Sequence, residues 1–121
     1  DVGAAVMALA LTPRGRLLAG DMQRGLLVSD DDGKRWRVTL PVGVMGLAVN
    51  PSDGKRVLLA ATDGLALSRD GGTTWKQVLA LSPGAGPVAW APSEPSIAYA
   101  VGLDAILYTT TDGGLTWQPV V

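Results

Sequence analysis

The chain of 121 residues contains no cysteine, no histidine and a single glutamate, Glu94. Without cysteine it can form neither a disulfide framework nor a thiol nucleophile, and without histidine it cannot build a Ser-His-Asp or Cys-His catalytic group. The ten Lys and Arg residues are scattered singly, and the net charge is −1. This scatter argues against nucleic acid or an anionic membrane surface as the main partner, because both require a concentrated basic patch.

Long hydrophobic runs are also missing. No stretch of about 18 apolar residues is present, so no membrane insertion is expected. No N-terminal signal peptide is visible, which is equally expected of a chain whose leader has been removed. Apolar residues nevertheless make up 47% of the chain, enough for a packed core. A cysteine-free protein of this kind fits the cytosol and also the bacterial periplasm.

One eight-residue pattern occurs three times. Residues 29–36, 68–75 and 110–117 each match [ST]-x-D-x-G-x-x-W, and the closing tryptophan recurs about every 40 residues. A repeat of this length is typical of architectures in which one supersecondary unit is copied and stacked. The pattern therefore says more about the fold than about the function.

The three copies agree over whole units, at residues 6–41, 44–81 and 86–121. Each unit contains four short apolar runs separated by turns rich in Gly, Pro, Asp and Ser, which predicts a four-stranded antiparallel meander. No long segment has helical periodicity, so no significant helix is expected. Such a meander repeated about every 40 residues is a β-propeller blade.

The predicted fold class is therefore all-β, with three blades in a single propeller segment over residues 1–121. The expected blade bounds are about 4–41, 42–81 and 82–121.

The repeated pattern falls between the predicted third and fourth strands, where it forms a hairpin loop. Its Asp can accept hydrogen bonds from backbone N–H groups of the turn, and its Gly can adopt a positive φ at little steric cost. Its Trp is expected to start the last strand and to bury its ring against the hairpin. The residues with this structural role are Ser29, Asp31, Gly33, Trp36, Ser68, Asp70, Gly72, Thr74, Trp75, Thr110, Asp112, Gly114, Thr116 and Trp117.

This pattern resembles the Asp-box, or bacterial neuraminidase (BNR), repeat, whose consensus is S-x-D-x-G-x-T-W. Arg35 stands where the consensus has Thr, and Thr110 stands where it has Ser. The resemblance implies a propeller similar to exported bacterial proteins of the glycosyl-hydrolase-like type and to photosystem II assembly factors. It favours an exported bacterial protein, although the sequence itself leaves the compartment open.

The acidic run at residues 30–32 suggests a calcium loop at first sight. Placing Gly33 at the sixth position of such a loop puts Val28 first and Thr39 twelfth, where carboxylates are required. We therefore predict no metal site here. Turn formation, and neither catalysis nor metal binding, is the expected role of the box carboxylates.

The loops of a propeller fall on two faces. The boxes share one face with the loops that join first and second strands, and the turns between second and third strands share the opposite face with the links between blades. The resemblance implies that this opposite face carries the binding or catalytic groups of Asp-box proteins. The candidate binding residues on it are Asp21, Gln23, Arg24, Asp63 and Asp104. Asp63 and Asp104 hold matching places in their units, so a turn signature without chemistry is the alternative.

Support for catalysis in the sequence is thin, and no catalytic residue is assigned. Glycoside hydrolysis stays open because two carboxylates, drawn from Asp21, Asp63 and Asp104, could flank a sugar. True sialidases also need an arginine cluster and a Tyr–Glu pair, and neither can be matched here. Trp90 replaces an aliphatic residue of the other two units and is better explained as a core residue than as a sugar-stacking platform.

Three isolated blades would expose flat apolar faces, whereas propellers usually close with roughly four to eight blades. We expect either a segment of a longer propeller or a homo-oligomer, such as a six-bladed ring made from two chains. The first functional hypothesis is a rigid scaffold that binds a protein or a glycan. The alternatives are part of a glycoside hydrolase and a self-assembling structural unit. No cofactor is predicted for any of them.

Overall fold

The computed structural model describes residues 6–120, which form twelve strands in three sheets. Sheet one holds β1 (Val6–Leu11), β2 (Leu17–Asp21), β3 (Gly25–Ser29) and β4 (Arg37–Leu40). Sheet two holds β5 (Val44–Val49), β6 (Val57–Ala61), β7 (Gly64–Ser68) and β8 (Lys76–Ala80). Sheet three holds β9 (Ala85–Trp90), β10 (Ala98–Gly102), β11 (Leu107–Thr110) and β12 (Gln118–Pro119). The described residues form no helix, and therefore none that could cross a membrane.

Every sheet is an antiparallel meander in which consecutive strands pair. Short hairpins fix the register: Asp21 pairs with Gly25 in sheet one, and Ala61 pairs with Gly64 in sheet two. Both turn glycines have a positive φ, so the chain reverses there without a steric penalty. The last strand of sheet three is the shortest and ends on Pro119, which a strand edge tolerates because no ladder N–H is needed there.

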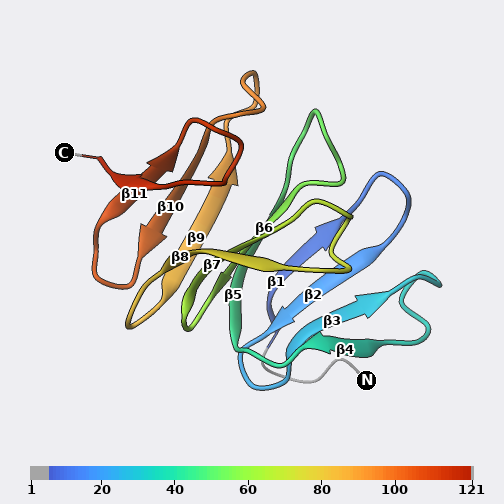
Figure 1. Ribbon diagram of the computed structural model, residues 1–121. Coiled ribbons are helices and arrows are strands. Elements are labelled where there is room, and N and C mark those ends of the chain that lie inside the picture. Colours follow the sequence, from blue (N-terminus) through green and yellow to red (C-terminus); the bar gives the residue numbers. More distant parts are fainter. Residues whose placement is uncertain (1–5, 121) are drawn as a thin grey trace.

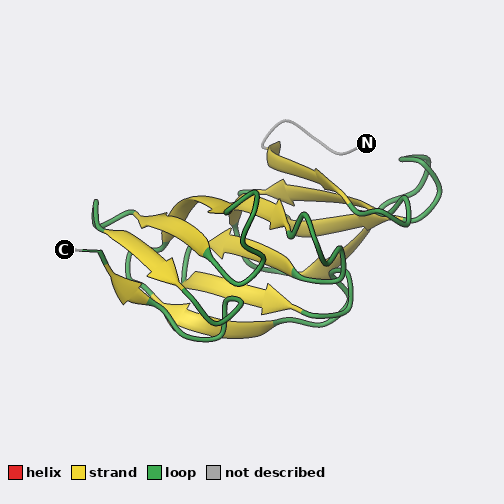
Figure 2. Ribbon diagram, turned by 90° about the horizontal axis from the view of Figure 1, so that it is seen from above, coloured by secondary structure: helices red, strands yellow, loops and turns green. Residues whose placement is uncertain are grey.

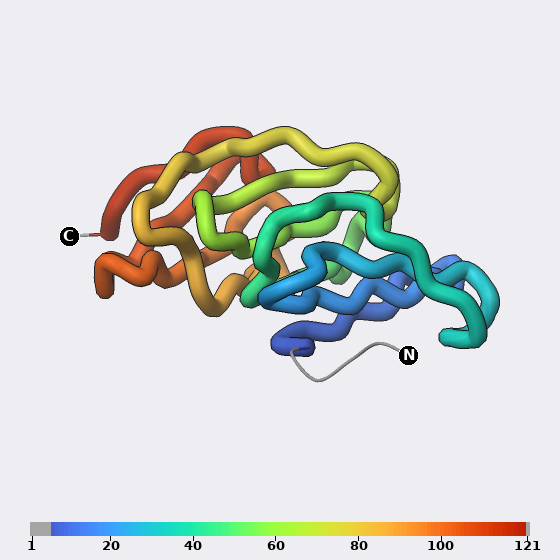
Figure 3. Tube along the Cα trace, turned by 90° about the horizontal axis from the view of Figure 1, so that it is seen from below, coloured from blue at the N-terminus to red at the C-terminus, as the bar shows by residue number. Residues whose placement is uncertain are grey.

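The three sheets follow one another in chain order and face each other (Figure 1; Figure 2). The same succession is visible along the Cα trace from below (Figure 3). The first strands lie side by side, with β5 in contact with both β1 and β9. A Cβ on Gly46 in β5 would lie 2.8 Å from the carbonyl oxygen of Gly86 in β9. Glycine at this position therefore allows the inner strands of neighbouring sheets to approach closely.

The hydrophobic core lies between the sheets and not within a single one. Between sheets one and two, Leu18, Leu26 and Val28 pack with residues of sheet two that include Val44 and Leu59. Two further clusters join sheets two and three, and they are built around Leu58, Leu67, Trp90 and Ala98 and around Ala60, Leu65, Ala85 and Ala100. Strand β6 of the middle sheet is buried along its whole length, as expected for a sheet covered on both faces. Strand β3 of sheet one is buried along its whole length as well.

The meander places the loops at two opposite ends of the sheets, as the ribbon shows (Figure 1). Loops from first to second strands and from third to fourth strands lie at one end, which we call the box face. The tight turns from second to third strands lie at the other end with the links between sheets. Any site on this segment must therefore be sought at one of these two ends or on the outer sheet faces.

Candidate functional site

Box two shows how the repeated pattern is built. The Ser68 hydroxyl donates to Asp70 Oδ1 over 2.7 Å and accepts from the Gly72 N–H over 2.8 Å. Asp70 also accepts from the Thr74 N–H at Oδ1 and from the Thr74 hydroxyl at Oδ2. The Trp75 indole N–H donates to the carbonyl oxygen of Gly72 over 3.2 Å. The carboxylate is thus the centre of a closed hydrogen-bond network.

Boxes one and three repeat this network with substituted residues. In box one the Arg35 side chain replaces the threonine hydroxyl, and its Nε donates to Asp31 Oδ2 over 3.0 Å. In box three the Thr110 hydroxyl replaces serine and donates to Asp112 Oδ1 over 2.7 Å. The indoles of Trp36 and Trp117 donate to the carbonyl oxygens of their own box glycines. Because each indole is held in its hairpin, the fourth strand begins one residue later than the sequence predicts, at Arg37 in sheet one.

These bonds lower the pKa of the box carboxylates. The Arg35 backbone N–H and side chain, with the Ser29 hydroxyl, lower the pKa of Asp31 to about 2. Burial raises the pKa of Asp70, but the hydroxyl and backbone N–H of Thr74 outweigh it and bring the value to about 2. The Thr116 hydroxyl and N–H lower the pKa of Asp112 further. A carboxylate that is fully ionised and engaged in this way is unsuited to general acid catalysis near neutral pH.

At the end opposite the boxes, Asp21 is buried in the β2–β3 turn. It accepts from the backbone N–H groups of Gln23 and Arg24, both over 2.8 Å, and forms an ion pair with Arg24 at 3.2 Å. These contacts, led by the Arg24 N–H, lower the pKa of Asp21. Gln23 and Arg24 are exposed beside it. These contacts of the Asp21 carboxylate stabilise the turn.

Asp63 and Asp104 lie in the two corresponding turns but differ in their bonding. Asp104 accepts from the Ile106 N–H at Oδ1 and from the Tyr108 hydroxyl at Oδ2, and the latter bond raises the pKa of Tyr108. Asp63 is held through its backbone oxygen, which accepts from the Gln77 side chain over 2.8 Å. Each turn is thus bonded within its own sheet, and the role of this face in binding stays a prediction.

Trp90 lies in the core between sheets two and three. It is 8% exposed, packs with Leu58 and Leu67, and donates its indole N–H to the carbonyl oxygen of Ala48 over 3.0 Å. A ring enclosed in this way offers no stacking surface for a sugar.

A hollow lies on the box face, between the loops of sheets one and two. We call it the loop cleft. Its volume is about 660 Å³, and its wall is formed by the β1–β2 loop, the β5–β6 loop and the first residues of boxes one and two. It joins residues that are far apart in the sequence.

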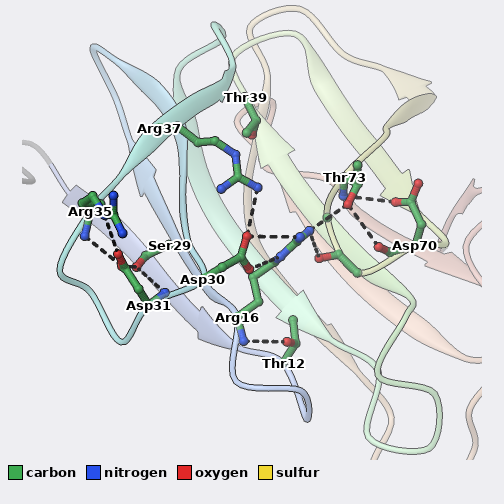
Figure 4. Close-up of polar contacts among 12 residues, drawn as sticks. Thr12, Arg16, Ser29, Asp30, Asp31, Arg35, Arg37, Thr39, Asp70 and Thr73 are labelled. Carbon is green, nitrogen blue, oxygen red and sulfur yellow. Dashed lines mark hydrogen bonds and ion pairs between the residues drawn. The ribbon is translucent and has the colours of Figure 1, made fainter.

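Arg16 connects the two sheets at this cleft. Its Nε donates to Asp30 Oδ1 over 2.8 Å, and its Nη1 donates to the Thr73 hydroxyl over 2.7 Å and toward the Gly71 carbonyl oxygen (Figure 4). Arg37 contacts the other oxygen of Asp30 at 3.1 Å. The Arg16 contact and then that of Arg37 lower the pKa of Asp30. The guanidinium of sheet one is thereby fixed on the box of sheet two.

The opposite wall of the cleft is braced as well. Asn50 is buried, and its side chain accepts from the N–H groups of Ser52 and Asp53 while donating to the carbonyl oxygen of Pro95 over 2.8 Å. A Cβ on Gly54 would lie 2.3 Å from Pro13, so the two loops touch at this point. The loops that form the cleft walls are thus held by hydrogen bonds within the chain and by direct contact with each other.

Sequence reasoning did not identify this cleft, although one signal was available. Arg16 and Arg56 hold matching places before the second strand, as the backbone bonds of Thr12 to Arg16 and of Asn50 to Arg56 show. The Arg56 side chain lies over Gly113 in box three. An arginine that reaches the next box is therefore a repeated feature, and sheet three carries Ile97 in its place. Among the described residues, no group of three or more Asp, Glu, His or Cys is placed to bind a metal ion.

Comparison with known families identifies the repeated pattern. The family model of the BNR/Asp-box repeat matches residues 108–119, which include box three. The resemblance inferred from the three boxes is thereby confirmed. No curated protein matches the chain in a sequence comparison.

Three solved structures show the same fold at low sequence identity. An ancestral GH74 enzyme is 19% identical with a TM-score of 0.84, covering 100% of this chain and 19% of that one. YCF48 from Cyanidioschyzon merolae is 20% identical with a TM-score of 0.73, covering 97% of this chain and 37% of that one. A structure of YCF48 bound to D1 peptide is 17% identical with a TM-score of 0.74, covering 96% and 40%.

The prediction of an all-β fold made of propeller blades is confirmed by these structures and by the three four-stranded sheets. The chain spans 19% to 40% of the length of these three proteins. At such identities the likeness establishes the fold and leaves the function to the chemistry of the site.

Proposed function

We propose that this propeller segment is a rigid, non-catalytic scaffold that binds an extended protein segment in the loop cleft. The observation that carries the proposal is the cleft itself, with walls held by Arg16 on one side and Asn50 on the other. A site with fixed walls loses little conformational entropy when a ligand binds.

The state of the carboxylates favours this scaffold over a glycoside hydrolase. Hydrolysis of a glycoside requires two carboxylates that flank the sugar. On the face opposite the boxes, the carboxylates of Asp21 and Asp104 accept hydrogen bonds within their turns. Of the three candidate acids on this face, Asp63 is the one whose carboxylate accepts no hydrogen bond among the described residues. One such group does not supply both an acid and a nucleophile or base.

The choice of a protein ligand over a glycan has two supports. One neighbour with the same fold, YCF48, is described bound to D1 peptide. In addition, Trp90, the aromatic residue considered for sugar stacking, is enclosed in the core. Both observations favour a peptide over a sugar.

The experiment is a selection of displayed random peptides on the purified chain, followed by affinity measurements on the enriched sequences. The blocking variant is Ser52→Trp, which adds an indole to an exposed position in the cleft wall. The matched control is Ser93→Trp, at the corresponding exposed position of the β9–β10 loop. Release of reducing sugar from a panel of polysaccharides is measured in parallel.

We expect peptides that bind the parent chain and the Ser93→Trp control equally and bind Ser52→Trp at least about tenfold more weakly. If nothing is enriched, or if the enriched peptides bind Ser52→Trp as well as the parent, the proposal is wrong. Sugar release that Asp63→Asn abolishes would establish the glycoside hydrolase alternative instead.

A further inference from the structure

We propose that the loop cleft selects acidic peptide segments, whose carboxylates pair with Arg14, Lys55 and Arg69. This inference rests on the proposed function and specifies the chemistry of its ligand. The three cations come from three different segments: the β1–β2 loop, the β5–β6 loop and the start of box two. They are brought to one cleft by the packing of sheet one on sheet two.

These three side chains are exposed, and within residues 6–120 none of them has an ion-pair or hydrogen-bond partner. The other cation of the cleft, Arg16, is already held by Asp30 and Thr73. A chain with a net charge of −1 thus gathers three free positive charges around one hollow. Guanidinium groups such as those of Arg14 and Arg69 can bind a carboxylate through two parallel hydrogen bonds.

The acids in the cleft wall do not neutralise these cations. Asp30 is shared between Arg16 and Arg37, and Asp53 lies 3.7 Å from Arg56. Asp70 is enclosed in the hydrogen bonds of box two. The side chains of Arg14, Lys55 and Arg69 pair with none of these acids, and the cleft lining holds four cationic side chains against three acidic ones.

The acidic residues of the cleft wall favour a peptide ligand over a uniformly charged polymer. A sulfated glycan or a nucleic acid carries negative charge along its whole length and would meet Asp53 and Asp70 as well as the cations. A peptide carries carboxylates on some residues only, and its backbone N–H groups can face the acids of the wall. Mixed charge in the lining thus favours an acidic peptide over a polyanion.

The test uses fluorescence anisotropy with a labelled peptide of spaced glutamates and its isosteric glutamine version. A sulfated oligosaccharide and inorganic sulfate serve as competitors. The cleft variant is Lys55→Gln with Arg69→Gln, and the matched control is Lys34→Gln with Lys76→Gln. The control removes the same charge from exposed positions outside the cleft.

We expect the glutamate peptide to bind more tightly than the glutamine version and to weaken as salt is raised. The cleft variant should bind it about fivefold to tenfold more weakly, and the control should stay within about twofold, since exposed ion pairs contribute modestly one by one. Adding Arg14→Gln to the cleft variant should weaken binding further.

Several outcomes would overturn this inference. Equal binding of the glutamine peptide, with binding still blocked by Ser52→Trp, would reject the acidic preference and leave the scaffold proposal standing. An equal loss in the matched control would mean that only overall charge matters. Stronger binding of the sulfated oligosaccharide would identify a polyanion site, and binding of neither peptide, together with an empty display selection, would refute the scaffold as well.

Discussion

Sheets one and two are each covered by the next sheet along the chain, whereas the equivalent face of sheet three is open. Leu18 in β2 and Leu58 in β6 hold the same position in their sheets, two residues after Arg16 and Arg56. Both leucines are 0% exposed. The corresponding residue of sheet three is Tyr99, which is 45% exposed. The β-strand pairing around the three positions is the same, so the difference is the presence of a covering sheet.

The contrast extends to the whole face. Ala60 and Leu65 of sheet two are fully buried under sheet three, whereas their counterparts Val101 and Leu107 are 38% and 40% exposed. At the other end of the stack, Leu9 of sheet one is 67% exposed. Burial in this molecule is therefore a property of the contact between sheets, and the repeat pattern alone does not set it.

The largest loss of stability should come from truncating Leu58, the buried counterpart of the half-exposed Tyr99. Leu58→Ala should lower the free energy of unfolding by about 3 kcal/mol, since it removes buried methyl groups between two sheets and leaves a cavity. Tyr99→Ala should lower it by no more than about 1 kcal/mol, because much of that ring is already in contact with water. Urea unfolding followed by tryptophan fluorescence measures both.

The opposite result would also be informative. A loss at Tyr99 as large as that at Leu58 would mean that the outer face of sheet three is covered in solution, as in a ring formed by two chains. Light scattering of the parent chain and of Tyr99→Ala at the same concentrations would then separate self-association from simple packing.

These positions show what the sequence could predict. The strand meanders, the boxes and the two loop faces follow from local patterns, because Gly, Pro and Asp mark each turn and every unit repeats them. The enclosure of Trp90 also agrees with the core interpretation.

The loop cleft could not be predicted in this way. Arg14, Lys55 and Arg69 come from three segments of two units, and they become neighbours only when sheets one and two pack. The repeat of about 40 residues predicts that equivalent positions recur, as Arg16 and Arg56 do. It does not predict which non-equivalent residues of neighbouring units become neighbours in space.

A smaller effect should distinguish the box glycines. Gly33 and Gly72 hold the same box position with φ of +85° and +96°. An alanine Cβ at Gly72 would lie 3.0 Å from Leu18 of the neighbouring sheet, while at Gly33 the nearest side-chain atoms are 3.6 Å away. Gly33→Ala should cost about 1 kcal/mol for the backbone strain alone, and Gly72→Ala about 2 kcal/mol. Equal losses in thermal or urea unfolding would show that the sheet contact at Gly72 yields without penalty.

The smallest difference is expected between the box carboxylates, because their environment is made by each box itself. The pKa values of Asp31, in box one, and of Asp70, whose box is contacted by Arg16, are both about 2, against an ordinary value of 3.8. A carboxyl with a lowered pKa in the folded state stabilises the fold fully above about pH 4 and loses this contribution as the pH falls toward 2. Melting temperatures measured from pH 7 to pH 2 should therefore drop mainly in that window, and Asp31→Asn and Asp70→Asn should each reduce the drop by a similar amount. A much larger reduction for Asp70→Asn would show that the neighbouring sheet shapes the box electrostatics as well as the packing.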